Sequence, residues 1–182
     1  MSQQRYVALL RGINVGKAKR ISMADLKAVY ESLGLSEVRT LLNSGNVVFT
    51  APSSLTKGLA AKLEATTTER LGVASRVTLL SAAELEAVVA GNPLLKVATD
   101  PSRLLVAVLR DAADRPKLEA LAKQSGVGGD LVLGTGPNER AAYLWCPDGL
   151  LQSPLAEKLL TKLGDAVTTR NWATILKLHA LM

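Results

Sequence analysis

Two short segments of this sequence hold the residue types that bind anions. The first contains four basic residues with no acidic residue between them, namely Arg11, Lys17, Lys19 and Arg20. The second is the run Asn43-Ser44-Gly45-Asn46, which offers amide and hydroxyl donors. Hydrogen bonds to an ionised group are roughly twice as strong as those between neutral groups. If the two segments meet in the fold, they could bind a phosphate or a carboxylate group.

The side chains that we expect to contact a small anionic, phosphorylated ligand are Arg11, Asn14, Lys17, Ser44 and Asn46. The two basic residues would neutralise charge, and the other three would fix orientation by hydrogen bonds. Arg170, next to a helix start that Asn171 can cap, is a second anion contact in this hypothesis. The alternative is that the glycines serve turns, the asparagines satisfy loop backbone and the cations are solvated.

Other chemistries find less support in the residue pattern. The loop from Gly12 to Ala18 differs from the Walker A phosphate-binding loop of nucleoside triphosphatases, because it has three residues between its glycines instead of four and Ala18 where Ser or Thr belongs. The sequence shows no base near Ser44 and no charge next to Cys146, and His179 falls in the terminal helix near Leu178 and Leu181, so none of the three is favoured as a nucleophile or general base. One cysteine and one histidine leave no zinc cluster, and we predict no cofactor. Whether the protein is an enzyme stays open.

Hydrophobic periodicity predicts the elements that position these residues. In the first half it predicts strands at 6–10, 38–42, 47–50 and 76–80, and helices at 22–33, at 55–71 and after Ser81. Ser22 followed by Asp25 resembles a helix-capping pair. The second half predicts strands at 104–109, 131–133, 141–146 and 166–168, and helices at 116–124, 154–163 and after Asn171.

The same order of elements therefore occurs twice. A βαββαβ unit folds as a four-stranded antiparallel sheet with both helices on one face, the ferredoxin-like arrangement. We predict an α+β protein made of two ferredoxin-like βαββαβ subdomains, a topological duplication, each followed by an extra helix. The predicted subdomains are residues 1–97 and 98–182, together one compact unit.

This topology brings the two anion-binding segments together. The first strand of such a sheet lies beside the third, so its end meets the turn that joins the second strand to the third. The helix that starts after Ser22 begins at the same edge, and its free N–H groups and dipole favour an anion there. We therefore expect one shared rim, formed by residues 11–20 and 43–46.

Composition narrows the class of protein. The 182 residues are 48% hydrophobic, which is ample for a buried core. No leader or membrane-spanning run is visible, and the single cysteine excludes an intrachain disulfide, so we expect a cytoplasmic protein without a membrane partner. The net charge of +6 is spread over both halves. Oligomeric state does not follow from these features.

A nucleic-acid partner is the less favoured alternative, and a self-association module without a ligand is a third. The sheets would need exposed aromatic side chains on which bases could stack. Tyr143 and Trp145 are two residues apart and so share a strand face, but such a pair more often belongs to a core.

Several motifs resemble one family along nearly the whole chain. They are Arg11-Gly-Ile-Asn-Val-Gly16 with Met23 and Leu26 after it, Val38-x-Thr40 before Ser44-Gly-Asn-Val-Val-Phe49, the pair Asn92-Pro93, and Thr169-Arg-Asn-Trp172. On these residues the chain resembles the mainly bacterial family called domain of unknown function 1697. The resemblance implies an α+β architecture with ferredoxin-like subdomains, and it implies no established activity, cofactor or catalytic residue.

Overall fold

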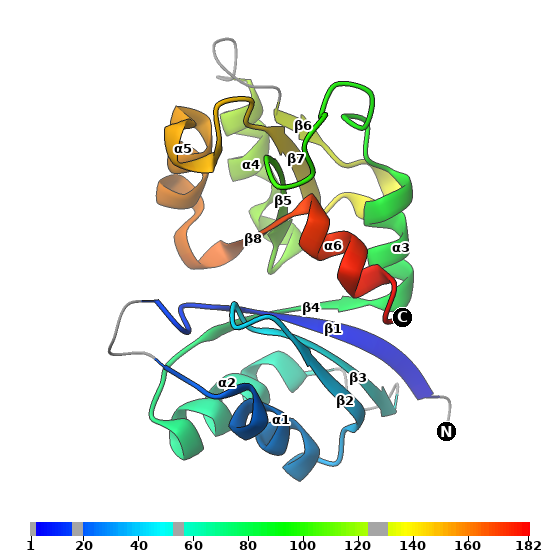
Figure 1. Ribbon diagram of the computed structural model, residues 1–182, viewed down its shortest axis with the longest axis vertical. Coiled ribbons are helices and arrows are strands. Elements are labelled where there is room, and N and C mark those ends of the chain that lie inside the picture. Colours follow the sequence, from blue (N-terminus) through cyan, green and yellow to red (C-terminus); the bar gives the residue numbers. More distant parts are fainter. Residues whose placement is uncertain (1–2, 16–19, 53–56, 124–130) are drawn as a thin grey trace. The chain divides into compact units, whose positions relative to one another are not determined.

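The fold contains two four-stranded sheets that lie in separate units of the chain (Figure 1). The computed structural model describes residues 3–15, 20–52, 57–123 and 131–182. The first unit is Met1–Leu85 with Leu181–Met182, and the second is Glu86–Ala180. Within each unit the strands are antiparallel and alternate with helices in the βαββαβ order that the sequence predicts.

The sheet of the first unit has the strand order β2-β3-β1-β4. Its strands are β1 (Gln3–Arg11), β2 (Ser36–Leu41), β3 (Asn46–Pro52) and β4 (Arg76–Ser81). The central strand β1 pairs with β3 in a register that sets Leu9 opposite Asn46. As predicted, the end of the first strand therefore lies beside the turn between β2 and β3.

Helices α1 (Met23–Ser32) and α2 (Leu59–Leu71) cover one face of this sheet, as Figure 1 shows. The predicted start of the second helix at Leu55 lies outside the described residues. Alternate residues of β1 point toward the helices, and Phe49 of β3 packs edge-on against Tyr30 of α1, with 5.5 Å between ring centroids. Apolar burial on this face fixes the register of the strands.

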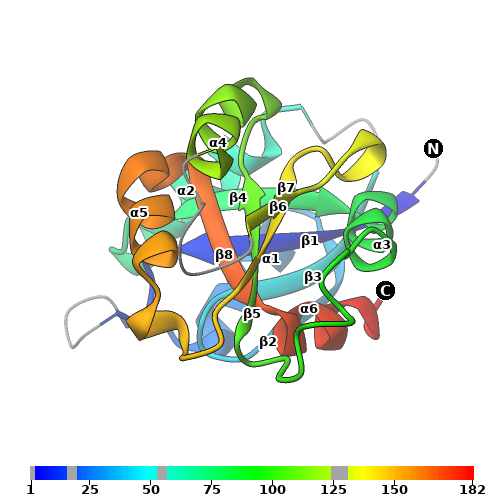
Figure 2. The same ribbon diagram turned by 90° about the horizontal axis from the view of Figure 1, so that it is seen from above.

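The sheet of the second unit has the equivalent order β6-β7-β5-β8. Its strands are β5 (Leu104–Leu109), β6 (Leu131–Leu133), β7 (Ala141–Trp145) and β8 (Val167–Asn171). Helices α4 (Arg115–Ala122) and α5 (Pro154–Leu163) pack against one face of this sheet and form a hydrophobic core with it. Helices α3 (Ala82–Ala90) and α6 (Trp172–His179) lie on the other side (Figure 2).

The prediction of an α+β fold with two ferredoxin-like subdomains is confirmed. Two details differ. Strand β8 runs on to Asn171, so Arg170 lies in a strand and not in the turn before the last helix. The units separate inside α3 and not at 97/98. The reason is that the end of α3 belongs with the second sheet, where the Tyr143 hydroxyl donates a 2.7 Å hydrogen bond to the Val88 carbonyl.

Gly45 lets the β2–β3 turn approach the end of β1 closely. Its carbonyl accepts a 2.8 Å hydrogen bond from the Leu10 N–H, and its φ of +82° lies in the left-handed region. A Cβ atom at this position would lie 2.7 Å from Ile13 Cδ1 and 2.8 Å from Leu10 Cβ. Only glycine fits there, because any side chain would both strain the backbone and collide with the loop after β1.

Replacing Gly45 with Ala should therefore cost more stability than the same change at Gly34. Gly34 also has a left-handed φ, +79°, but an added Cβ would have no heavy atom of the described chain within 4 Å. Backbone strain alone costs about 1–2 kcal/mol, and crowding adds about 1–3 kcal/mol. Urea unfolding of both variants measures the difference. Equal losses of unfolding free energy would show that the close approach at Gly45 does not matter.

Candidate functional site

The loop after β1 is fixed at two points by buried side chains. Ile13 and Ile21 are 4% and 6% exposed and belong to the core of the first unit. Asn14 between them has a φ of +54°, a left-handed conformation that asparagine tolerates better than most residues. The first part of the loop and its last residue are therefore anchored in the core of the first unit.

The Asn14 side chain connects this loop to the β2–β3 turn. Its Oδ1 atom accepts a hydrogen bond from the Ile21 N–H at 2.8 Å. Its Nδ2 atom donates to the Ile21 carbonyl at 3.2 Å and to the Asn43 carbonyl at 2.6 Å. We call this set of three hydrogen bonds the Asn14 clamp. The predicted meeting of the two segments is thus observed, but the amide of Asn14 is already engaged within the protein.

Asn46 plays a similar internal part in the turn. It is completely buried, and its Nδ2 atom donates to the Leu41 carbonyl at 2.8 Å and to Ser44 Oγ at 3.0 Å. Ser44 itself is exposed. These bonds stabilise the conformation of the turn, so Asn46 has a structural role there. Ser44 lies at the surface of the turn.

The start of α1 lies at the same edge of the sheet. Ser22 caps the helix: its Oγ atom accepts from the Asp25 N–H at 3.0 Å and donates to Asp25 Oδ2 at 2.6 Å. The predicted capping pair is confirmed. The N–H groups of Met23 and Ala24 come too early in the helix to have an acceptor inside it, and they carry the positive end of the helix dipole.

A pocket of about 490 Å³ opens where these pieces meet. It is lined by Asn14, Arg20, Ile21, Ser22 and Asn43. The Arg20 guanidinium and the Asn43 side-chain amide are exposed, and neither makes a hydrogen bond or ion pair within the described ranges of the chain. These two groups can therefore meet a ligand without first breaking a contact in the protein.

The other basic residues of the prediction occupy different positions. Arg11 is the last residue of β1, half-buried, and pairs across the sheet with Arg76 of β4. Lys17 lies outside the described residues. Arg170 belongs to the second unit, where its Nη1 atom donates to Thr168 Oγ1 at 3.1 Å and to the Thr169 carbonyl at 2.8 Å. Burial lowers the pKa of the Arg170 guanidinium to about 10.

The pocket is lined by residues from both predicted segments, but not by all of the side chains that the sequence favoured. Arg20 and Asn43 line the pocket, although sequence reasoning favoured Arg11 and Asn46. The signal that could have found Arg20 is its position directly before Ile21 and the Ser22 cap, because a residue there must lie beside the helix start. No comparable sequence signal separates Asn43 from Asn46.

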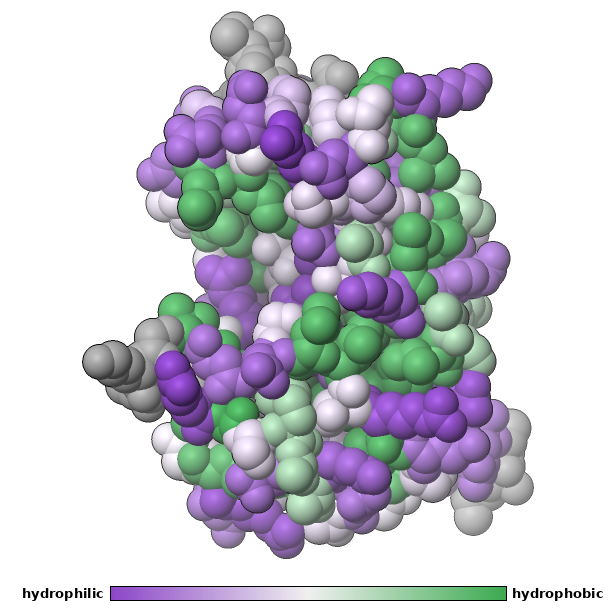
Figure 3. All heavy atoms as spheres, in the orientation of Figure 1, coloured by the Kyte–Doolittle hydropathy of each residue, from purple (hydrophilic) through white to green (hydrophobic). Residues whose placement is uncertain are grey.

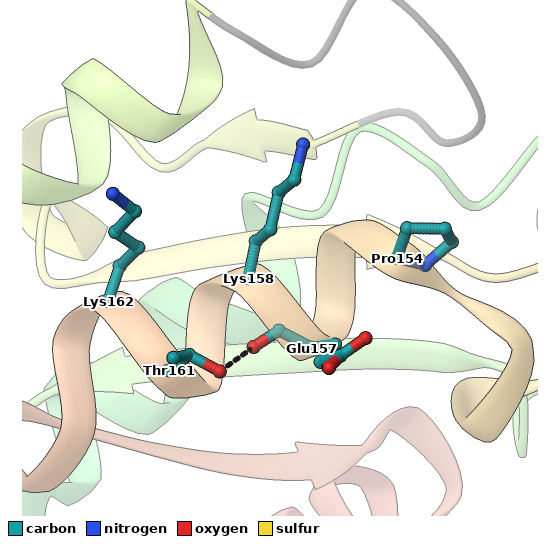
Figure 4. Close-up of a pocket in the computed structure, with 5 residues that line it drawn as sticks. All are labelled: Pro154, Glu157, Lys158, Thr161 and Lys162. Carbon is teal, nitrogen blue, oxygen red and sulfur yellow. Dashed lines mark hydrogen bonds between the residues drawn. The ribbon is translucent and has the colours of Figure 1, made fainter.

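A second pocket, of about 290 Å³, lies along α5 in the second unit (Figure 4). Its lining residues are Pro154, Glu157, Lys158, Thr161 and Lys162. The two lysines point to the same side of the helix, and the Thr161 hydroxyl donates to the Glu157 carbonyl at 2.8 Å. All of these lining residues come from one helix, whereas those of the first pocket come from the loop before α1 and from the β2–β3 turn.

The aromatic pair of β7 does not form a stacking surface. Tyr143 is completely buried, and its hydroxyl accepts from Asn138 Nδ2 at 2.9 Å while donating to Val88. Trp145 is half-buried. The interpretation of Tyr143 as a core residue is confirmed. Its ring is therefore not exposed for stacking on a base, which the nucleic-acid alternative would need.

Cys146 and His179 both interact with a side chain of the same unit. Burial raises the pKa of the Cys146 thiol, although a hydrogen bond with Ser153 acts in the opposite direction. His179 Nε2 lies 2.5 Å from Glu86 Oε2. Among the described residues, no group of three or more His, Cys, Asp or Glu side chains could hold a metal ion.

Figure 3 shows one face of the molecule coloured by the hydropathy of its residues. On the face drawn in Figure 3, hydrophilic and hydrophobic side chains occur over both units. None of the helices in the described ranges is long and apolar enough to cross a membrane.

The fold and the rim define an α+β protein with two ferredoxin-like units and a polar pocket at the end of its first strand. The family model described as protein of unknown function, DUF1697, matches residues 3–135, and the chain belongs to this family. The solved structure of conserved bacterial protein SP0830 from Streptococcus pneumoniae is similar, with a TM-score of 0.80, 25% identity and 99% of each chain covered. A search of curated proteins finds no match.

Replacing Asn14 with Asp tests the Asn14 clamp. Aspartate has nearly the same shape, but its second oxygen would face the carbonyl oxygens of Ile21 and Asn43, which now accept from Nδ2. We expect a loss of about 1–3 kcal/mol of unfolding free energy at pH 7. The loss should shrink below about pH 4, where the protonated carboxyl group can donate one hydrogen bond.

The matched control is Asn43→Asp, since the Asn43 side chain makes no hydrogen bond within the described chain. It carries the same charge change and should leave stability nearly unaltered. Urea unfolding across pH measures both variants. If the two aspartates cost the same, the Asn14 side chain does not hold the loop and the turn together.

Proposed function

We propose that this protein binds a small anionic, phosphorylated ligand in the pocket at the end of β1. The observation that carries the proposal is the convergence of the exposed Arg20 guanidinium, the Asn43 amide and the start of α1 on one pocket. A cation, a neutral donor and free backbone N–H groups are the three kinds of group that recognise a phosphate oxygen.

The groups around the pocket also indicate how an anion would be oriented. Asp25 already occupies the hydroxyl of Ser22, so an entering anion would meet the N–H groups of Met23 and Ala24 instead of the Ser22 side chain. Arg20 would neutralise its charge from the loop. Arg11, at the end of the strand from which the loop departs, adds to the positive field of the rim, and Lys17 is proposed to do the same.

The size of the pocket suits a small molecule. Ligand pockets in proteins commonly have volumes of about 300–1,000 Å³, and this one has about 490 Å³. We propose binding and assign no reaction to the pocket, since the Ser22 hydroxyl that lines it is engaged in capping α1. A cytoplasmic location fits this function, since phosphorylated metabolites are abundant there and the single, buried Cys146 suits a reducing compartment.

Calorimetric titration with inorganic phosphate and pyrophosphate tests the proposal. Arg20→Ala should weaken binding by about 1.5 kcal/mol, the low end for hydrogen bonds to charged groups, because the side chain is exposed. The matched control is Arg70→Ala, which removes an exposed arginine from the last turn of α2 in the same unit. Equal effects of the two variants would show only a general attraction to a basic protein.

Asn43→Asp gives a second, independent measurement. It places a negative charge in the pocket without breaking a hydrogen bond of the described chain, so it should lower anion affinity at least as much as Arg20→Ala does. Titration at two salt concentrations separates a specific site from screening, because exposed charges lose their effect at high salt. If Arg20→Ala and Asn43→Asp both leave the anion affinity unchanged, the anion binds elsewhere on the protein.

A further inference from the structure

Two exposed apolar residues are sequence neighbours of residues that line the proposed anion pocket. The described residues include six large hydrophobic side chains that are exposed: Val15, Leu42, Leu95, Val97, Leu151 and Leu176. Only the first two belong to the first unit, and they are 69% and 48% exposed. Each is the sequence neighbour of a residue that lines the pocket, since Val15 follows Asn14 and Leu42 precedes Asn43.

The Asn14 clamp holds these two neighbours near each other. The 2.6 Å hydrogen bond from Asn14 Nδ2 to the Asn43 carbonyl joins the segments that carry them. A single exposed apolar side chain needs no explanation. Here two exposed apolar residues each stand next in sequence to a residue that lines the pocket, on two segments that a hydrogen bond joins.

The backbone at Leu42 adds an independent indication. Leucine is held at a φ of +58°, in the left-handed region that favours glycine and asparagine. A polar residue would serve this turn better in two respects, because asparagine tolerates the conformation and prefers water. An apolar side chain in an unfavourable conformation, exposed to solvent, suggests a function that depends on that side chain.

We infer that the ligand of this pocket is a phosphate monoester whose substituent is apolar, held with its phosphate at Arg20 and the start of α1 and its substituent against Val15 and Leu42. This inference rests on the proposed anion site and specifies the second half of the ligand. A phosphate ester combines the anion and an apolar group at a separation of one or two bonds, which fits an apolar edge directly beside the pocket.

A series of soluble alkyl phosphates tests this inference by calorimetry. Hexyl phosphate should bind roughly tenfold more tightly than methyl phosphate, because we expect about two of its additional methylene groups to be buried against Val15 and Leu42. Burial of about two methylene groups corresponds to roughly one decade of affinity. Val15→Ser and Leu42→Asn should each reduce that ratio while leaving the affinity for methyl phosphate unchanged. Leu42→Asn should also preserve or raise the unfolding temperature, which a merely structural leucine would not allow.

The control variant is Leu151→Ser, which removes a 98% exposed leucine from the second unit and should leave the ratio unchanged. If methyl and hexyl phosphate bind equally well, the anion site stands and the inference is wrong. If neither binds, the anion site itself is wrong and the inference falls with it. If hexyl phosphate still binds more tightly than methyl phosphate by the same ratio in both Val15→Ser and Leu42→Asn, the inference is also contradicted.

The same chemistry occurs in lipid headgroups, so a vesicle measurement separates the two sources. Vesicles of phosphatidylcholine with phosphatidic acid present the phosphate monoester at a membrane surface, whereas hexyl phosphate presents it in solution. We expect binding to the soluble ester and no cosedimentation with these vesicles at physiological salt. Binding to the vesicles alone would overturn the assignment of a soluble ligand.

Discussion

The hydrogen bonds of the Asn14 side chain are the contact on which the candidate site depends. They join the loop after β1 to the start of α1 through Ile21 and to the β2–β3 turn through Asn43. A ferredoxin-like sheet brings these segments to one edge, but topology alone does not fix their separation. One amide that satisfies three backbone groups in two segments does so. The pocket exists because this residue holds its walls in place.

Backbone constraints at neighbouring positions act in the same direction. Gly45 allows the turn to lie against Ile13, and burial of Ile13 and Ile21 anchors the loop in the core. The Ser22 cap then begins α1 beside Arg20. Each of these features positions backbone. Within the described residues, the Arg20 guanidinium, the Asn43 amide and the first N–H groups of α1 take no part in these contacts. The chemistry of the pocket follows from what the scaffold leaves unengaged.

Much of this arrangement could be predicted from the sequence. Continuous apolar strands, the Ser22 and Asp25 pair and the 43–46 turn gave the element order and the meeting of the two segments, because hydrophobic period and capping are local properties. The roles of individual asparagines were not predictable. Asn14 and Asn46 turned inward to backbone carbonyls, whereas Asn43 stayed exposed, and that choice depends on distances between segments remote in sequence. Arg170 similarly became a half-buried strand residue because β8 extends further than its apolar residues.

The central claim is that an anion binds at the start of α1 beside Arg20. The most direct test is a titration of isotope-labelled protein with inorganic phosphate, followed by nuclear magnetic resonance of the backbone amides and the arginine Nε groups. The account predicts saturable shifts for Met23, Ala24 and Arg20 Nε, with the amides of α5 unaffected. Shifts that are confined to the Lys158 and Lys162 face of α5, or that spread evenly over basic residues without saturating, would contradict it.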